Sequence, residues 1–327
     1  MGPQLPRPLE GPAIRVLYIG GWGRSGSTLL SQMLGAIPGF FVGGELRETW
    51  PRSLENRLCG CGDPFGSCVF WRKVGEEAFG GWSQANLPEL VRLRHRLDRQ
   101  WSVPLLMSRS ATRSTRMSVQ KYVTALESLY GAIQAASGAE VIVDSSKLPS
   151  YALLLRRMRR VDLRIVHLVR DSRGVLFSWQ KRVPRLDTPG EDRQMRRYGP
   201  LSASLRYGAY NLAIHQLARL GHPYLFLRYE DLVTNPQMNL RRVVRHAGLD
   251  PDDVRFDFLE DGAVRLGPNH MVDANPLRFA VGSVPLEVDD TWRRELGAAR
   301  RLAVSILTFP WLLRYGYVPG RAGGVRT

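Results

Sequence analysis

Long hydrophobic runs are missing from this 327-residue sequence. No stretch of about 18 or more apolar residues occurs, although a membrane-spanning helix needs one, and the N-terminal residues lack the apolar core of a signal peptide. We therefore expect a soluble protein located in the cytoplasm. The longest apolar segment, residues 302–313, is too short to span a bilayer and contains Pro310, so we predict that it forms a buried helix end.

Lysine is also scarce: the chain has four lysines beside 42 arginines, and its net charge is +16. Guanidinium groups match the oxygens of phosphate and sulfate, so an arginine-rich surface suits anionic ligands. The basic clusters at 156–160, 193–197 and 241–245 are scattered along the chain, which favours solvated helix faces. No helix-turn-helix, zinc-finger, RRM or KH signature accompanies them. We therefore expect no nucleic-acid partner.

Cysteine is limited to Cys59, Cys61 and Cys68, which lie together in LCGCGDPFGSCVFW. Three thiolates could bind zinc with a distant histidine, but the spacing differs from the usual pair of C-x-x-C knuckles. A Cys61–Cys68 disulfide is a second alternative, which a reducing cytoplasm disfavours. The favoured interpretation is three free thiols that pack a local loop with Phe70 and Trp71.

The sequence does contain a series of apolar segments, each followed by a helical pattern. Its composition, 44% apolar and 23% charged, is typical of a globular α/β protein. Apolar runs without alternation that precede helices indicate a parallel sheet covered on both faces. We predict a three-layer α/β sandwich of the P-loop kind with a central parallel sheet, whose strands are 14–19, 40–42, 140–144, 163–169 and 224–229.

We expect residues 14–320 to form a single domain, preceded by a flexible, proline-rich arm at 1–13. A polar region with helical spacing, about 86–137, lies within a helical insertion at 46–140. We expect this insertion, the part of the chain with the fewest motifs, to include the acceptor wall and a helical lid. It contains four tryptophans that could stack on a sugar or aromatic ring, although packing in the core is the commoner position for such side chains: Trp50, Trp71, Trp82 and Trp101.

The first strand is followed by GWGRSGST, in which Gly21 and Gly26 occupy the glycine positions of the phosphate-binding pattern G-x-x-x-x-G-K-[ST]. Thr28 stands at the hydroxyl position, but Ser27 replaces the lysine, and the nearest cation is Arg24. Backbone N–H groups of such a turn, with the positive end of the following helix, form an anion site. The missing lysine argues against a triphosphate ligand.

A second polar element, VRDSRGVLFSWQKR, follows the strand at 163–169. Arg170 ends the strand, Ser178 lies about two helical turns later, and Arg182 is four residues beyond Ser178. Residues four apart share a helix face, so we predict that Ser178 and Arg182 grip one anion together with Arg170.

These two motifs, R-S-G-[ST]-T-L and R-D-x-R-x-x-x-x-S, resemble the donor-binding motifs of sulfotransferases that use 3′-phosphoadenosine 5′-phosphosulfate (PAPS). The resemblance covers about residues 15–318 and implies PAPS as the co-substrate. It also implies how the donor is held. The implied ligands of the 5′-phosphosulfate are Arg24, Ser25, Gly26, Ser27 and Thr28, those of the 3′-phosphate are Arg170, Ser178 and Arg182, and Tyr229 would lie against the nucleotide.

Sulfuryl transfer is a loose, in-line displacement that depends on positioning and on stabilisation of the leaving group. The sulfuryl group carries less negative charge than a phosphoryl group, so we expect no metal requirement. The acceptor hydroxyl needs a base, and Glu45 matches the glutamate of tyrosylprotein and carbohydrate-type sulfotransferases. Lys147, in DSSKLP, stands where the aryl branch has a histidine, and with Arg24 it is a candidate for stabilising the leaving group.

The segment NHMVDANPLRF resembles the G-N-P-x-R-F segment of carbohydrate-type sulfotransferases, with Ala274 in place of the glycine. The resemblance makes Asn275 and Arg278 candidates for closing over the donor phosphates. It also favours a hydroxyl of a carbohydrate, a glycolipid or another metabolite as the acceptor.

Two alternatives remain. A P-loop kinase or NTPase would use Asp144, at the end of the apolar strand VIVD, to hold magnesium. That alternative gives no role to Arg170 and Ser178. A non-enzymatic nucleotide-binding protein of the same fold would tolerate the loss of Glu45.

Overall fold

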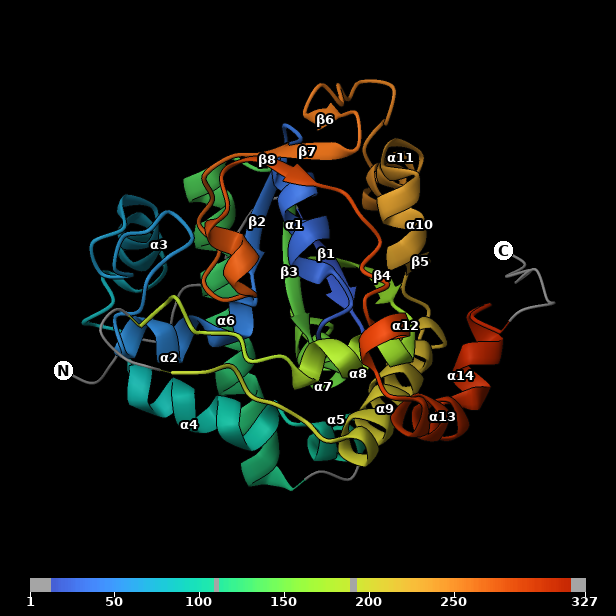
Figure 1. Ribbon diagram of the computed structural model, residues 1–327. Helices are drawn as coiled ribbons and strands as arrows, with labels where there is room; N and C mark the ends of the chain where they lie inside the picture. The colour runs from blue at the N-terminus through green and yellow to red at the C-terminus, as the bar shows by residue number, and fades with distance from the viewer. Residues whose placement is uncertain (1–12, 109–111, 189–192, 319–327) are drawn as a thin grey trace.

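The computed structural model describes residues 13–108, 112–188 and 193–318, so most of the arm predicted at 1–13 lies outside the described residues. The centre is a sheet of five parallel strands in the order β2-β3-β1-β4-β5 (Figure 1). This sheet confirms the predicted α/β class, and every predicted strand is present. The strands are β1 (Ile14–Gly20), β2 (Phe40–Gly44), β3 (Val141–Lys147), β4 (Val161–Val169) and β5 (Tyr224–Arg228).

Helices cover both faces of this sheet. Side chains alternate between the faces of a strand, so Leu17 and Ile19 of β1 pack with one set of helices and Val16 and Tyr18 with the other. This burial on both sides explains why the strands read as continuous apolar runs. One face carries α1 (Ser27–Gly35), α10 (Tyr229–Thr234) and α11 (Pro236–Ala247), and the other carries α6 (Arg113–Ser137), α7 (Pro149–Leu155) and α9 (Pro200–Ala218).

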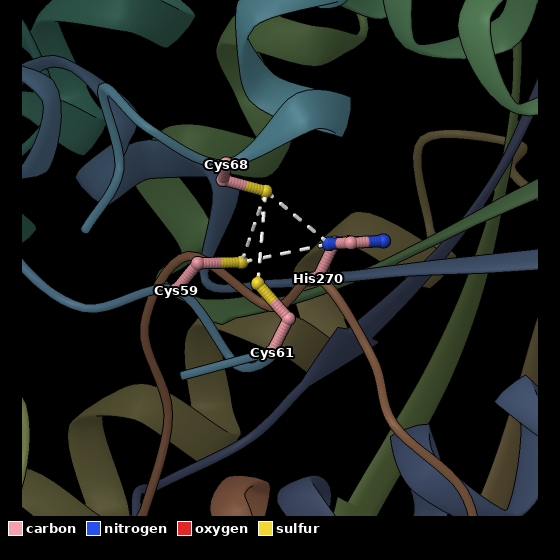
Figure 2. Close-up of side chains that lie close together, drawn as sticks. All are labelled: Cys59, Cys61, Cys68 and His270. Carbon is pink, nitrogen blue, oxygen red and sulfur yellow. Dashed lines mark hydrogen bonds between the residues drawn. The ribbon is translucent and has the colours of Figure 1, made fainter. Parts of the chain in front are cut away.

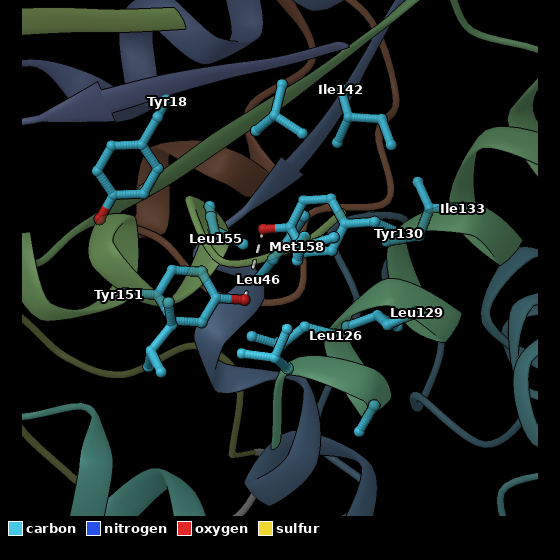
Figure 3. Close-up of a cluster of buried hydrophobic side chains, with 14 of the residues drawn as sticks. Tyr18, Leu46, Leu126, Leu129, Tyr130, Ile133, Ile142, Tyr151, Leu155 and Met158 are labelled. Atoms are coloured by element: carbon cyan, nitrogen blue, oxygen red, sulfur yellow. Dashed lines mark hydrogen bonds between the residues drawn. The ribbon is translucent and has the colours of Figure 1, made fainter. Parts of the chain in front are cut away.

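The predicted helical insertion is made of several separate helices. The region expected to be helical at 86–137 is divided, because Asp98 leaves helical geometry after α4 and Pro104 stands in the first turn of α5. Side chains of α6 then pack toward Ile142 and Tyr151 in the core (Figure 3). The elements before α6 are η1 (Leu46–Glu48), α2 (Thr49–Leu54), α3 (Val69–Phe79), α4 (Leu87–Leu97), η2 (Gln100–Ser102) and α5 (Val103–Met107).

A second, antiparallel sheet has no counterpart among the predicted elements. Its strands are β6 (Leu259–Glu260), β7 (Ala263–Leu266) and β8 (Gly282–Pro285). They form no apolar run, because all are short, β6 and β7 each carry a charged side chain, and β8 begins with glycine and serine. The chain between β7 and β8 includes the 3-10 turn η3 (Pro276–Phe279) and runs beside the end of β2, where Gly44 pairs with Asp273.

The prediction of a buried helix end at 302–313 is wrong. The apolar run is divided at Thr308 between α13 (Ala298–Leu307) and α14 (Phe309–Arg314), which follow α12 (Trp292–Glu295). Leu302, Ile306 and Phe309 are more than half exposed, with exposed fractions of 63%, 65% and 52%. Within the described part of the chain, no helix has both the length and the apolar character needed to cross a membrane.

Candidate active site

A cavity of about 450 Å³ opens at the carboxyl ends of β1, β3 and β4. Strands β2 and β3 lie on one side of β1, and β4 and β5 lie on the other, so the strand order reverses direction at β1. Ligands of open parallel sheets bind at such a switch point. Residues from widely separated segments therefore meet in one place. The predicted site residues that line the cavity are Arg24, Gly26, Ser27, Thr28, Glu45, Lys147, Arg170, Ser178, Tyr229 and Asn275.

The loop between β1 and α1 turns on positive φ values at Gly21 (138°), Arg24 (70°) and Gly26 (92°). Gly26 is the N-cap of α1 and has no side chain to cap the helix, so the first N–H groups of α1 remain available to a ligand. These groups and the positive end of the helix attract an anion. Ser25 is buried beside them, and its hydroxyl has no hydrogen-bond partner among the described residues.

Arg170, directly after β4, forms the other basic element of the cavity. Its guanidinium carbon lies 4.8 Å from the centre of the Tyr229 ring, which packs in turn on Gly26. The guanidinium donates to the backbone oxygen of Asp289 at 2.9 Å and pairs with the Asp289 carboxylate at 3.1 Å. Burial alone would raise the pKa of Asp289, but the Thr291 hydroxyl and the Arg170 charge lower it to about 2. Arg170 therefore already holds an anionic group.

Glu45 and Lys147 form an ion pair on the cavity wall. The Glu45 backbone N–H donates to the Asp273 carbonyl at 2.8 Å, and Lys147 Nζ donates to Glu45 Oε1 at 2.5 Å and to the Ser145 carbonyl at 2.9 Å. Lys147 has a φ of 69°, a left-handed conformation that a side-chain-bearing residue adopts at a cost. Burial raises the pKa of Glu45, and the Lys147 charge opposes that rise. A desolvated carboxylate with a raised pKa suits a general base.

Arg24 extends into the same cavity from the loop. Its guanidinium carbon lies 5.1 Å from the centre of a Trp179 ring, and Nη2 lies 3.2 Å from the Met195 sulfur. Burial lowers the pKa of Arg24. No carboxylate of the described residues forms an ion pair with it, so its charge is available to an anionic ligand.

The NPLRF segment reaches the cavity only in part. The backbone N–H of Asn275 donates to Thr28 Oγ1 at 3.3 Å, so this end of the segment lies against the loop. Arg278 does not line the cavity: it is 1% exposed, and its guanidinium donates to the carbonyls of Val272 at 2.8 Å and Leu58 at 3.1 Å. The predicted contact of Arg278 with the donor is therefore unsupported, because this guanidinium holds separate segments together inside the protein.

Arg182 also lies away from the cavity. Helix α8 (Ser172–Gln180) ends before it, and Lys181 is already extended, with φ −61° and ψ 140°. The prediction that Ser178 and Arg182 share a helix face is wrong, because the helix stops two residues too early. Ser178 lines the cavity, whereas Arg182 is exposed.

The aromatic wall of the cavity is absent from the sequence predictions. Trp22 packs with Tyr210 at 4.5 Å and with Trp179 at 5.3 Å between ring centres, and Tyr198 lies 4.8 Å from Trp179. All four side chains line the cavity. The sequence could have indicated two of these residues: Trp22 lies inside the glycine-rich loop, and Trp179 directly follows Ser178, so both stand within the predicted donor motifs.

The tryptophans of the insertion lie elsewhere. Trp50 and Trp71 are fully buried in the core, Trp82 donates to the Trp71 carbonyl at 2.7 Å, and Trp101 is 72% exposed. No described residue of 46–140 lines this cavity. None of the four tryptophans therefore forms a wall of this cavity, and Trp50 and Trp71 take the core positions that were the alternative.

Asp144, which a kinase would need for magnesium, does not line the cavity either. It is fully buried and accepts hydrogen bonds from the Tyr130 hydroxyl and from the Ser146 backbone N–H. Burial raises the pKa of Asp144 to about 6 in spite of these donors. The geometry thus gives no support to the kinase alternative.

Comparison with known proteins identifies the class. A sequence profile described as the sulfotransferase family matches residues 17–253. The chain therefore belongs to the sulfotransferase family.

Individual relatives match less of the chain. Carbohydrate sulfotransferase 3 of Homo sapiens is 34% identical over 105 residues, and that of Rattus norvegicus is 31% identical over 101 residues. Each match covers 28% of this chain and only 21% of the relative.

Two solved structures are similar over nearly the whole chain. The sulfotransferase domain of the Synechococcus PCC 7002 olefin synthase is 21% identical, with 94% of this chain and 98% of that chain covered and a TM-score of 0.42. The sulfotransferase domain from the curacin biosynthetic pathway is 18% identical, with 92% and 99% covered and a TM-score of 0.47.

Proposed function

We propose that this protein transfers a sulfuryl group from PAPS to a hydroxyl of a carbohydrate, a glycolipid or another metabolite. The observation that supports the proposal most strongly is the meeting of two anion-binding elements in one cavity, the α1 loop with Arg24 and the Arg170–Tyr229 pair. A donor that carries anionic groups on both its 5′ and 3′ sides needs two such elements. Residues 14–320 act as a single domain in this proposal.

The donor is held along the cavity. The N–H groups at the start of α1, with Ser27 and Thr28, bind the 5′ side, and the buried Ser25 hydroxyl is free to turn toward it. Arg170 and Ser178 bind the 3′-phosphate, for which Arg170 must release Asp289. Tyr229 places its ring against the nucleotide.

Glu45 acts as the base of the reaction. It accepts the proton of the acceptor hydroxyl as that oxygen attacks the sulfur atom, while the bond from sulfur to the bridging phosphate oxygen breaks. The products are the sulfated acceptor and 3′-phosphoadenosine 5′-phosphate. Lys147 and Arg24 offset the negative charge that develops on the bridging oxygen. No divalent metal takes part in this scheme, because the sulfuryl group carries less charge than a phosphoryl group.

The acceptor enters beside the aromatic wall of Trp22, Trp179, Tyr198 and Tyr210. Such side chains offer large, rigid surfaces with polar edges, which suit a ligand that has both apolar faces and hydroxyls. The name of the matching relatives, carbohydrate sulfotransferase 3, supports a carbohydrate among the three acceptor classes.

The first experiment compares ligands by thermal stabilisation of the purified chain. A ligand that binds only the folded protein raises the melting temperature according to RT ln(1 + [L]/Kd). We expect 3′-phosphoadenosine 5′-phosphate to stabilise strongly and 5′-AMP and Mg·ATP weakly. Preferential stabilisation by Mg·ATP would contradict the donor assignment and reopen the kinase alternative.

The Arg170→Ala variant tests the position of the 3′-phosphate. Loss of this guanidinium should weaken 3′-phosphoadenosine 5′-phosphate by at least about tenfold, since a charge-assisted contact contributes roughly 1.5–3 kcal/mol, and should leave 5′-AMP nearly unchanged. Calorimetric titration measures both affinities, with Arg92→Ala on the exposed face of α4 as the control. Equal losses for both nucleotides would show that the 3′-phosphate binds elsewhere.

A further inference from the structure

The three cysteines of the chain and His270 converge on one point. Cys59, Cys61 and Cys68 lie in the loop between α2 and α3, whereas His270 lies between β7 and η3. Figure 2 shows their side chains directed toward a common centre, and their four ligand atoms all lie within 4.8 Å of one another.

The separations are those of ligands around a tetrahedral ion. Cys68 Sγ lies 3.7 Å from Cys61 Sγ and 3.8 Å from Cys59 Sγ, and His270 Nδ1 lies 3.7 Å from Cys59 Sγ and 3.4 Å from Cys68 Sγ. Tetrahedral zinc, with its usual bond lengths, places sulfur atoms about 3.8 Å apart and sulfur about 3.6 Å from nitrogen. A disulfide would need sulfur atoms at about 2.05 Å. All three cysteines are free thiols.

The surrounding structure fixes the ligands in place. The His270 ring stacks on Phe70 at 5.0 Å with an interplanar angle of 13°, and the Trp71 indole N–H donates to the His270 carbonyl at 3.0 Å. The Gly60 N–H donates to the Met271 carbonyl at 3.0 Å, which joins the two segments that carry the ligands. Gly60 packs closely on this segment, because a Cβ there would lie 2.1 Å from the side-chain oxygen of Asn269 and would displace that side chain.

We propose that Cys59, Cys61, Cys68 and His270 bind one zinc ion. Three thiolates and an imidazole are soft and borderline ligands, which select zinc over magnesium or calcium. The four protein ligands fill a tetrahedral coordination shell, so no position is left for a water or a substrate, and the site is structural. Cys61 and His270 are half-buried, which leaves a path for the ion to enter. This site replaces the interpretation of the cysteines as simple packing residues.

The zinc ion joins the insertion at 46–140 to the segment 268–275, which runs from His270 to the cavity wall. His270 is followed by Asp273, whose carbonyl accepts the Glu45 N–H at 2.8 Å, and by Asn275, which contacts Thr28. Zinc binding therefore fixes the segment against which Glu45 is positioned. The proposal does not depend on the identity of the sulfuryl donor.

The experiment measures metal in the full-length chain, purified under reducing conditions without chelators. We expect elemental mass spectrometry to find about one zinc ion per chain. The variants Cys68→Ser and His270→Gln should hold less than about a tenth of this amount of zinc. His95→Gln, a histidine on the exposed face of α4, is the matched control and should keep its zinc.

Two measurements on the unsubstituted chain remain decisive if the variants fail to fold. Replacement of zinc by Co²⁺ should give the visible absorption bands and the thiolate charge-transfer band of a tetrahedral sulfur-rich site. A strong chelator should lower the melting temperature, and added zinc should restore it. A reduced chain that holds less than about a tenth of an equivalent of zinc and gives no Co²⁺ spectrum would overturn the proposal. A disulfide in freshly purified protein would overturn it as well.

Discussion

Glu45 is the single carboxylate among the described residues that line the cavity. Glu45→Gln preserves the size of the side chain and removes the proton acceptor, so we expect kcat to fall at least about a hundredfold. The affinity for 3′-phosphoadenosine 5′-phosphate should stay within about twofold, because the donor is held by other groups. Steady-state kinetics and calorimetry test the two parts, with Glu77→Gln on the surface of α3 as the control. Full turnover in Glu45→Gln would exclude Glu45 as the base.

In the proposed mechanism, Lys147 sets the pH range in which Glu45 acts as the base. The proposal requires the deprotonated carboxylate, so we expect activity to rise with pH through the pKa of Glu45. Burial raises this pKa and the Lys147 charge lowers it. Lys147→Met removes the lowering contribution, so the acidic limb of the kcat profile should move to higher pH. The exposed Lys73→Met is the control, and an unmoved acidic limb would show that Lys147 does not act on the titrating group.

The loop before α1 depends on a glycine for its shape. An alanine at Gly26 would have to adopt a φ of 92°, and its Cβ would lie 2.4 Å from the Tyr229 ring. We expect Gly26→Ala to lower the free energy of unfolding by about 1–3 kcal/mol and to weaken 3′-phosphoadenosine 5′-phosphate more than tenfold, roughly 1.4 kcal/mol or more. Denaturant titration and calorimetry measure these effects. Gly267→Ala, where no atom lies within 4 Å of an added Cβ, should change neither, and an unaltered Gly26→Ala would show that the loop does not bind the donor.

The linker between β8 and α12 places a carboxylate on Arg170. The pKa of Asp289 is lowered to about 2, so its carboxylate is charged at neutral pH and would compete with the proposed 3′-phosphate for the same guanidinium. Asp289→Asn should therefore bind 3′-phosphoadenosine 5′-phosphate several-fold more tightly at neutral pH. The neighbouring Asp290→Asn makes the same change in net charge on an exposed residue, so equal gains in both variants would point to a general charge effect.

At the scale of the whole molecule, the sequence predicts features that neighbouring residues encode, but it does not predict contacts between residues far apart in the chain. The strands and the two motifs are visible in the sequence because apolar runs and glycine turns are encoded by neighbouring residues. The pairing of Cys68 with His270, 202 residues away, depends on the path of the whole chain. The buried position of Arg278 depends on that path in the same way. The short strands of the second sheet carry no hydrophobic pattern, and the end of α8 shifts Arg182 off the face that regular helical spacing predicts.

The central place of β1 in the sheet has a consequence for the protein while it is still being made. β1 is the first described strand, yet its partners β3 and β4 follow much later, with Arg15 beside Val141 and Val16 beside Leu163. At typical rates of synthesis, the 126 residues from Arg15 to Val141 take roughly 6–25 s to leave the ribosome. During that time neither edge of β1 has its partner strand, and its apolar side chains are not yet covered. We therefore expect the nascent chain to offer a site for chaperone binding at a strand that ends up in the middle of the sheet.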